Sequence, residues 1–242
     1  MIEEKPEICF LLPPTEVKKK GKKYQAVIAK VDTTKLYTVE EACALVKETS
    51  TVKFDATVDV SFRFNVDPKY ADQQLRGTLV LPHGNGKTKK ILAITHKEEE
   101  AKQAGADFVG GKELLQKIQT ENWFDFDIIV ATPDMMGELG KMGRILGPKG
   151  LMPNPKTGTV GMDIKKMVTE LKAGKVEYRA DRDGNVNLAV GKVSFDTEKL
   201  TENVKTIVAQ ILKVRPSVVK GTYVLSCFLC TTMCPSIKLN IL

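Results

Sequence analysis

The sequence predicts a discontinuous α+β domain into which an α/β domain is inserted. Near both ends of the chain, apolar and polar residues alternate, as in half-buried strands of an antiparallel sheet. In the middle, short apolar runs alternate with helical patterns, which is typical of a parallel, Rossmann-like α/β unit. We therefore expect a flexible basic arm at 1–23, domain I at 24–83 and 175–242, and the inserted domain II at 84–174.

The arm has no amphipathic period and ends in a lysine cluster at residues 18–23. Its apolar run, Ile8 to Leu12, is too short for the core of a signal peptide, and acidic residues precede it. The chain has no run of eighteen apolar residues, so we expect no membrane span. Five cysteines, an odd number in a chain of this size, favour a reducing cytoplasm.

The first half of domain I is predicted to contain one helix and one long strand. Thr38 and Glu41 form a capping box ahead of an apolar stripe. From Phe54 to Phe64 apolar residues alternate with polar ones, which indicates a half-buried strand. One face of this strand should pack in the core, and the other should be wet or touch a ligand.

Domain II is predicted from alternating strand and helix signals. Thr95 with Glu98 caps its first helix, Pro133 opens a short one, and Asp163 caps the last, which Gly174 ends. The expected strands are 91–95, 107–109 and 127–131, and a further helix is expected at 112–119.

After Gly174 the alternation of strands returns. Short strands around 176–178 and 186–190 flank Asp183-Gly184, a hairpin turn signal. Thr197 is expected to cap a helix that ends before Pro216, and the last strand is expected at 223–230.

Residues 143–159 contain glycines and prolines at a density that no ordinary helix or strand has. Gly147, Gly150 and Gly158 allow backbone conformations closed to other residues, and three prolines fix φ. The segment therefore predicts a shaped loop. Its cations, Arg144, Lys149 and Lys156, suggest that it meets an anion, although a structural connection with solvated lysines is the alternative.

Several motifs with known chemistry fail on their context. Gly86-Lys87-Thr88 resembles the end of a phosphate-binding loop, but a strand rather than a helix is expected after it. Cys227 and Cys230 have redox or zinc spacing, but within a strand they would point to opposite faces. The histidines, His83 and His96, have no nucleophile beside them. We therefore expect no enzyme, metal, cofactor or small-molecule substrate; a nucleotide-dependent enzyme on domain II is the alternative, followed by a cysteine-based redox or zinc module.

The overall charge points to a polyanionic partner. The 242 residues include 37 Lys and Arg against 30 Asp and Glu, a net charge of +7. Folded RNA is recognised through phosphates and 2′-hydroxyls by Arg, Lys, Ser, Thr and backbone groups. The composition is compatible with such a partner, although many enzymes are as basic.

The run from Met142 to Lys156 closely resembles the signature of the L-one family of large-subunit ribosomal proteins, bacterial type. The similarity extends over roughly Lys22 to Leu239, with matches at 53–55, 72–77, 81–84, 191–192 and 231–233. The resemblance implies the same two-domain plan and a ribosome-associated, cytoplasmic protein that binds a stalk of large-subunit ribosomal RNA. It also implies that the protein helps deacylated tRNA leave the exit site and, as in many bacterial members, that it represses its own messenger RNA.

The resemblance also implies which residues touch RNA. Domain I would use Lys53, Phe54, Arg179, Asp181, Lys192, Ser226, Thr231, Thr232 and Met233, and domain II a smaller contact through Arg144, Lys149 and Lys156. Ordinary alternatives remain open: a capped strand end for the Thr-Thr-Met tripeptide, the first core residue of a strand for Phe54, and a surface ion pair for Arg179 with Asp181. The chain departs from the family at Cys234, where a glycine is usual, and at Asn187, where a histidine is usual.

Overall fold

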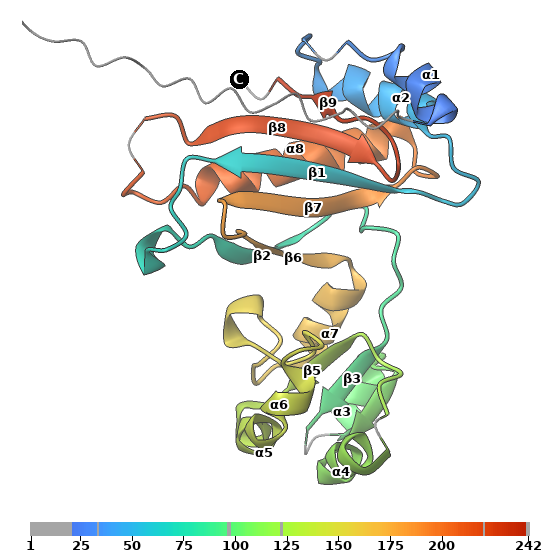
Figure 1. The fold of residues 1–242 in the computed structure, drawn as a ribbon. Helices are drawn as coiled ribbons and strands as arrows, with labels where there is room; N and C mark the ends of the chain where they lie inside the picture. The colour runs from blue at the N-terminus through green and yellow to red at the C-terminus, as the bar shows by residue number, and fades with distance from the viewer. Residues whose placement is uncertain (1–20, 33, 96–97, 122, 220, 241–242) are drawn as a thin grey trace, which may run out of the picture.

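The computed structural model describes residues 21–32, 34–95, 98–121, 123–219 and 221–240. Two bodies are joined by two chain crossings (Figure 1). Residues 1–20 of the expected arm lie outside the described part. The remainder of that arm differs from the prediction, because Lys22 and Lys23 form the first turn of helix α1 (Lys22–Ile28).

Domain I is built on an antiparallel sheet whose strands come from both ends of the chain. Strands β1 (Thr57–Phe64), β7 (Asn185–Lys192), β8 (Val224–Thr231) and β9 (Ile237–Lys238) lie in the order β7-β1-β8-β9. Because β1 lies between β7 and β8, the discontinuous α+β fold is confirmed. Strand β9 was not predicted, since a strand of two residues has no readable period.

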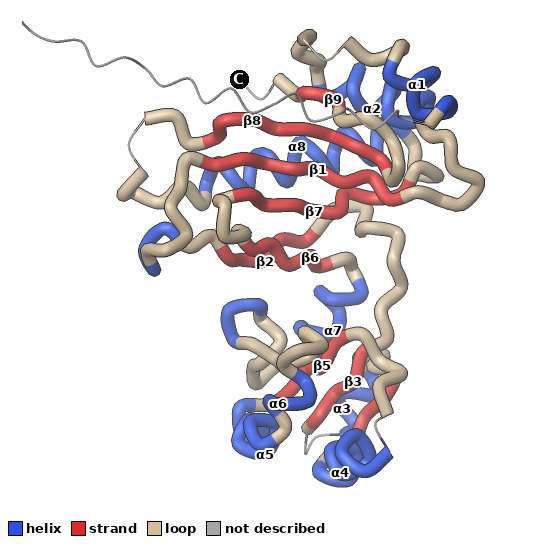
Figure 2. The backbone as a smooth tube through the Cα atoms, in the orientation of Figure 1, coloured by secondary structure: helices blue, strands red, loops and turns tan. Residues whose placement is uncertain are grey.

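One face of this sheet is covered and the other is open. Helices α2 (Val39–Thr49) and α8 (Thr197–Lys213) pack on the covered face, where Val58, Val60 and Phe62 of β1 are buried. The alternate β1 residues are only half-buried or exposed. Figure 2 shows the helices behind the sheet and the uncovered face in front. The predicted division of β1 into a core face and a wet face is confirmed.

The helix starts largely follow the sequence signals. Thr38 and Glu41 form the predicted capping box of α2. The N-cap of α8 is Asp196 rather than Thr197, whose backbone is already helical. Asp163 occupies the N-cap of α7 (Ile164–Lys172), but its side chain makes no capping hydrogen bond.

The predicted hairpin after Gly174 is wrong in its pairing. The turn exists, because Gly184 has φ +74° and its N–H donates to the Asp181 carbonyl. Strand β6 (Lys175–Arg179), however, pairs with β2 (Arg76–Val80) in a separate two-stranded sheet. The missing side chain at Gly77 lets β2 lie against Tyr178, because a Cβ there would be 2.5 Å from the tyrosine oxygen. This close cross-strand fit has no local sequence signal.

Domain II is the predicted parallel α/β unit. Strands β3 (Ile91–Ile94), β4 (Phe108–Gly110) and β5 (Ile128–Ala131) are parallel in the order β4-β3-β5. Two apolar clusters pack on the sheet: one includes Leu92 and Ile94, and the other includes Ile91 and Ala93. Besides α7, the domain contains α3 (Glu98–Gln103), α4 (Lys112–Glu121), α5 (Met136–Lys141), α6 (Gly143–Leu146), and the 3₁₀ turns η2 (Pro133–Met135) and η3 (Pro155–Thr157); a further turn, η1 (Ala71–Gln73), lies in domain I.

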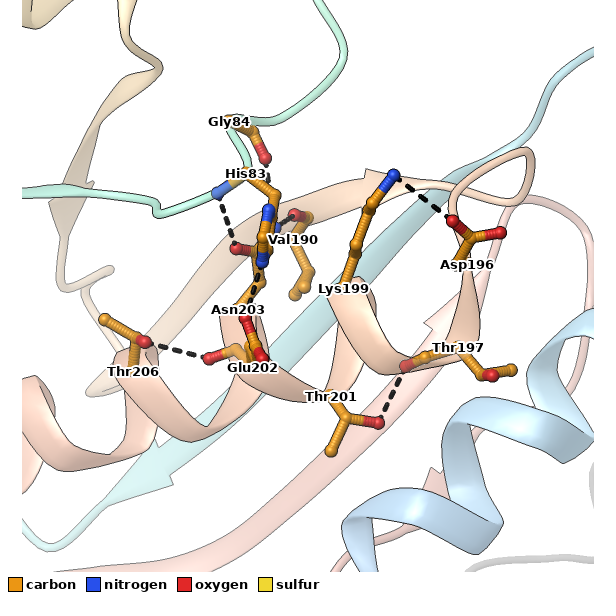
Figure 3. A network of polar contacts seen from close by, with 10 residues as sticks. All are labelled: His83, Gly84, Val190, Asp196, Thr197, Lys199, Thr201, Glu202, Asn203 and Thr206. Carbon is orange, nitrogen blue, oxygen red and sulfur yellow. Dashed lines mark hydrogen bonds and ion pairs between the residues drawn. The ribbon is translucent and has the colours of Figure 1, made fainter.

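The two chain crossings touch each other. A Cβ on Gly174, which has φ +98°, would lie 2.5 Å from the Gly84 Cα. The buried Asn203 amide of α8 donates to the carbonyls of Gly84 and Val190, and its oxygen accepts from the His83 N–H (Figure 3). This amide ties the start of the first crossing to domain I, which supports domain boundaries at Gly84 and Gly174.

Candidate nucleic-acid interface

One end of the domain I sheet brings together residues far apart in sequence. Val58 pairs with Thr231, and the Thr232 N–H donates to the Thr57 carbonyl at 3.2 Å. The segments 53–57 and 231–233 therefore lie side by side, just beyond the start of β1 and the end of β8. We refer to residues 53–57, 192 and 231–233 as the sheet-end cluster.

Two large apolar side chains of this cluster are exposed. Phe54 is 61% exposed and Met233 is 76% exposed. Strand β1 begins at Thr57, so the interpretation of Phe54 as the first core residue of the strand is wrong. An aromatic ring and a thioether on a polar surface provide an apolar platform on which a planar ligand can stack.

The backbone at Met233 is in the left-handed region, with φ +68°. It is the non-glycine residue with positive φ in the described part of the chain. Such a conformation costs free energy and is found most often at functional sites. The Cys234 N–H donates to the Thr231 carbonyl at 3.0 Å, which closes the turn that displays the Met233 side chain.

The two threonines of the cluster differ in accessibility. Thr231 is 3% exposed, and its buried hydroxyl has no hydrogen-bond partner in the structure. Thr232 is half-buried, with its hydroxyl 3.5 Å from the Thr57 carbonyl, at the limit of a hydrogen bond. Of the two hydroxyls, that of Thr232 is thus the one available to a ligand.

Lys192 is fixed beside these segments. Its ammonium donates to the Asp55 carbonyl at 3.3 Å and to the Thr57 hydroxyl at 3.1 Å. The Asp55 carboxylate in turn accepts from the backbone N–H and hydroxyl of Ser194. Gly86 lies against the Lys192 stem, since a Cβ there would be 2.8 Å from its Cγ. A positioned ammonium with capacity for a third hydrogen bond results.

The remaining predicted domain I residues lie at the other end of the sheet. Ser226 pairs with Arg63 at the far end of β1, and Asp181 donates its N–H to the carbonyl of Asn185, which also pairs with Arg63. Five residues of β1 separate this end from Val58, a distance of about 17 Å. The predicted residues thus form two groups on one sheet.

Arg179 and Asp181 do not form the ion pair considered as an alternative. Both residues lie in the described part of the chain, and no Arg179–Asp181 contact occurs among its ion pairs. The neighbouring pair with Glu177 is made by Arg76 instead. The side chains of Arg179 and Asp181 are exposed.

The open face of the sheet connects the two groups and was not singled out from the sequence. It carries Asp59, Ser61 and Arg63 of β1, flanked by Asn187 and Phe228. Burial raises the pKa of the Asp59 carboxyl, while nearby Lys87 and Lys192 oppose this shift. The alternation in β1 had assigned these residues to the wet face, but nothing local marked them as part of a site.

The loop of residues 143–159 follows the prediction in part. Gly150 and Gly158 have φ +71° and +62°, as expected. Gly147 is right-handed, with φ −59°; a Cβ there would instead lie 2.6 Å from the Gly143 carbonyl oxygen. Residues 143–146 form helix α6, so the first part of the predicted loop is helical.

The three cations of that segment are exposed but lie on different elements. Arg144 is on α6 and Lys156 on η3. The Lys149 ammonium lies 3.1 Å from the centre of the Phe124 ring, a cation–π contact. The three side chains therefore do not originate from one rigid loop.

The alternative chemistries find little support in the geometry. Gly86 to Thr88 precede strand β3 rather than a helix, as a phosphate-binding loop would require. Cys227 is buried and Cys230 lies on the opposite, open face; burial raises the pKa of Cys227 to about 12. Within the described ranges, no three His, Cys, Asp or Glu side chains are placed to hold a metal ion, and no helix is long and apolar enough to span a bilayer.

Comparison with known proteins decides the family. The sequence profile described as "Ribosomal protein L1p/L10e family" matches residues 46–235. The chain belongs to this family. Proteins named "Large ribosomal subunit protein uL1" are similar over nearly the whole chain. That of Mycoplasma capricolum is 56% identical over 221 residues, 91% of this chain and 98% of that protein. That of Macrococcus caseolyticus is 59% identical over 224 residues, 92% and 96% of the two chains.

A third L1p/L10e relative, from Mesoplasma florum, is 56% identical over 222 residues. These names describe ribosomal proteins and not enzymes, which agrees with the absence of a catalytic constellation from the sequence motifs. The resemblance stated from residues 142–156 is confirmed.

Proposed function

We propose that this chain is a structural constituent of the large ribosomal subunit in the cytoplasm and binds a folded stalk of its ribosomal RNA through domain I. The observation that carries the proposal is the sheet-end cluster. There Phe54 and Met233 are exposed beside the Thr232 hydroxyl and the fixed Lys192 ammonium. Stacking surface, hydroxyl and cation are the groups with which proteins hold unpaired bases, sugars and phosphates.

The second group of residues extends the proposed contact along the sheet. Arg179, Asp181 and Ser226 lie near Arg63, about 17 Å from the sheet-end cluster. A separation of this size suits a rigid RNA fold that touches both ends of one sheet, and Arg63 between them adds a cation. The buried Thr231 would contribute through its backbone.

Domain II would supply a smaller, second RNA contact through Arg144, Lys149 and Lys156. Their exposure supports this role, and their placement on different elements supports a diffuse electrostatic contact rather than a shaped pocket. The family assignment supports two further roles: helping deacylated tRNA leave the exit site, and repression of the chain's own messenger RNA by an RNA segment shaped like the ribosomal site.

Equilibrium binding to a stalk fragment of large-subunit ribosomal RNA tests the proposal. Phe54→Ala and Met233→Ala should each weaken binding by about 1–3 kcal/mol, the usual contribution of one stacked base. Met162→Ala removes a side chain that is 70% exposed on domain II and should leave affinity unchanged. Wild-type affinity in both folded cluster variants would contradict the assignment.

A further inference from the structure

An apolar groove lies at the end of domain I opposite the sheet-end cluster. It has a volume of about 470 Å³ and is lined by the start of β8, the end of α8 and the chain around Leu36 and Leu239. Leu36, Leu212 and Leu225 are 51%, 47% and 52% exposed on it. The groove adjoins the core through Tyr223, Cys227 and Leu239, which are buried. Its size is within the range of clefts that hold organic ligands, roughly 300–1,000 Å³.

The backbone beside the groove is also incomplete. Strand β9 pairs with Phe228 and Leu229 of β8, and Leu239 reaches Cys227. Among the described residues, no strand pairs with residues 224–226 on the side away from β1. An open strand edge next to exposed leucines is a surface that an extended apolar peptide can join.

The chain contains one apolar segment outside the described residues. Residues 8–12 read Ile-Cys-Phe-Leu-Leu, between acidic residues on one side and a polar, lysine-rich stretch on the other. This segment precedes the part of the chain that resembles the family, and the relatives match 91–92% of the chain. An apolar run of this kind is costly to leave in water unless something covers it.

The charges near the segment and the groove are complementary. Glu3, Glu4 and Glu7 precede the apolar run, whereas Arg215 and Lys238 line the groove. The Arg215 guanidinium donates to the carbonyls of Val219 and Gly221 and retains further N–H donors.

The connection is long enough to reach. Eight residues, 13–20, separate the apolar run from Gly21 and span up to about 26 Å when extended. From Gly21 the chain runs through α1 to Leu36, which lines the groove. Helix α1 adds about 10 Å, and the following residues are shortened by turns at Val31 and Lys35.

We propose that the apolar run Ile8-Cys9-Phe10-Leu11-Leu12 of the same chain occupies this groove. The segment covers the exposed leucines, extends the sheet beside residues 224–226, and places its glutamates near Arg215 and Lys238. The amino-terminal extension thereby becomes part of domain I. This assignment is independent of the proposed RNA contact, because the groove lies at the other end of the sheet from the sheet-end cluster.

Limited chymotrypsin digestion of the full chain tests this docking, with the fragment ending at Phe10 followed by mass. In the intact protein, cleavage after Phe10 should be at least about tenfold slower than in a free peptide of residues 1–20, because a docked segment is cut only when it opens. Leu225→Asp and Leu212→Asp, each at a half-exposed position, should abolish the protection. Met162→Asp, on domain II, should retain it.

A second measurement covers the case in which a groove variant folds poorly. Removal of residues 1–17 should lower the melting temperature of the parent protein and have no effect in the Leu225→Asp background. Cleavage of the parent at the rate of the free peptide would overturn the proposal. So would protection that survives both groove variants, since the segment would then be held elsewhere. Protection that grows with protein concentration, together with a dimer in sedimentation, would assign the groove to the segment of a second copy and overturn the intramolecular form.

Discussion

At the scale of single residues, the sheet-end cluster separates hydroxyl chemistry from charge. The Thr232 hydroxyl has only a 3.5 Å contact within the protein, so it is free to turn toward RNA. Thr232→Val keeps the shape and removes the hydroxyl, and it should weaken binding to the stalk RNA by about 1–3 kcal/mol. The slope of affinity against salt concentration should hardly change, because no phosphate is involved.

Lys192→Ala should behave differently in the same titrations. The ammonium is held by Asp55 and Thr57 in a position to meet phosphate, so its loss should reduce the salt slope by about one unit. Salt titrations of both variants against the same RNA measure this contrast. Equal changes of slope in the two variants would show that the roles are assigned wrongly.

Cys234 illustrates a residue whose role the structure reverses. The sequence suggested that the family's glycine is needed there for a left-handed backbone or a close approach to RNA. The left-handed residue is Met233, and the Cys234 sulfur lies 3.0 Å from the Thr49 carbonyl oxygen. Cys234→Gly should therefore remove a contact between the turn and α2 and lower the melting temperature. RNA affinity should stay flat or weaken; markedly tighter binding would revive the close-approach idea.

At the scale of elements, β1 shows how an alternating strand prepares a binding face. Its buried residues anchor the sheet on α2 and α8, while Asp59, Ser61 and Arg63 are left on the open face between the two groups of predicted contacts. A carboxylate there is unfavourable twice. Burial raises its pKa, and RNA phosphates would approach the same face.

Asp59→Asn is expected to stabilise the fold at neutral pH and to tighten RNA binding. Because folding raises the pKa of Asp59, ionised Asp59 destabilises the protein. That cost is absent below the unfolded pKa and is fully present once the pH exceeds the folded pKa. The melting temperatures of the two proteins should thus differ at pH 7 and converge in acid. A variant that is less stable at pH 7 would reveal a favourable partner of the carboxylate.

Local patterns predicted most elements, and the failures share a physical cause. The Thr38 capping box and the alternation of β1 depend on neighbours within a few residues, so they could be read directly. The pairing of β6 with β2 depends on Gly77 meeting Tyr178 across the sheet, which no local pattern encodes. The same reason applies to the site. Lys53 and Met233 were expected from the family signature, whereas Arg63 becomes a candidate only when its strand is seen between the two groups.

At the scale of the whole molecule, the two crossings decide how separable the domains are. Gly84 and Gly174 are in contact, so the chain leaves and re-enters domain I at one point. Asn203 holds His83 and Gly84 to α8 from the domain I side (Figure 3). An interdomain cavity of about 260 Å³ lies beyond this point, lined by β2 and β6 on one side and by residues 150–153 on the other. The contact between the domains is therefore small beside their separate cores.

Removal of residues 84–174 with a short glycine linker between His83 and Lys175 should leave a folded domain I. The ends to be joined are already adjacent, because a Cβ on Gly174 would be 2.5 Å from the Gly84 Cα. All strands of the β7-β1-β8-β9 sheet and helices α2 and α8 are retained, as are the β2 and β6 pair. Since the sheet-end cluster and the Arg179, Asp181 and Ser226 group are intact, the trimmed protein should keep most of its affinity for the stalk RNA. The salt slope should fall by up to about three units with the loss of Arg144, Lys149 and Lys156. Circular dichroism and thermal melting establish folding before binding is measured. A folded, trimmed protein with collapsed affinity would mean that domain II carries the principal contact and that the division of roles proposed for the two domains is wrong.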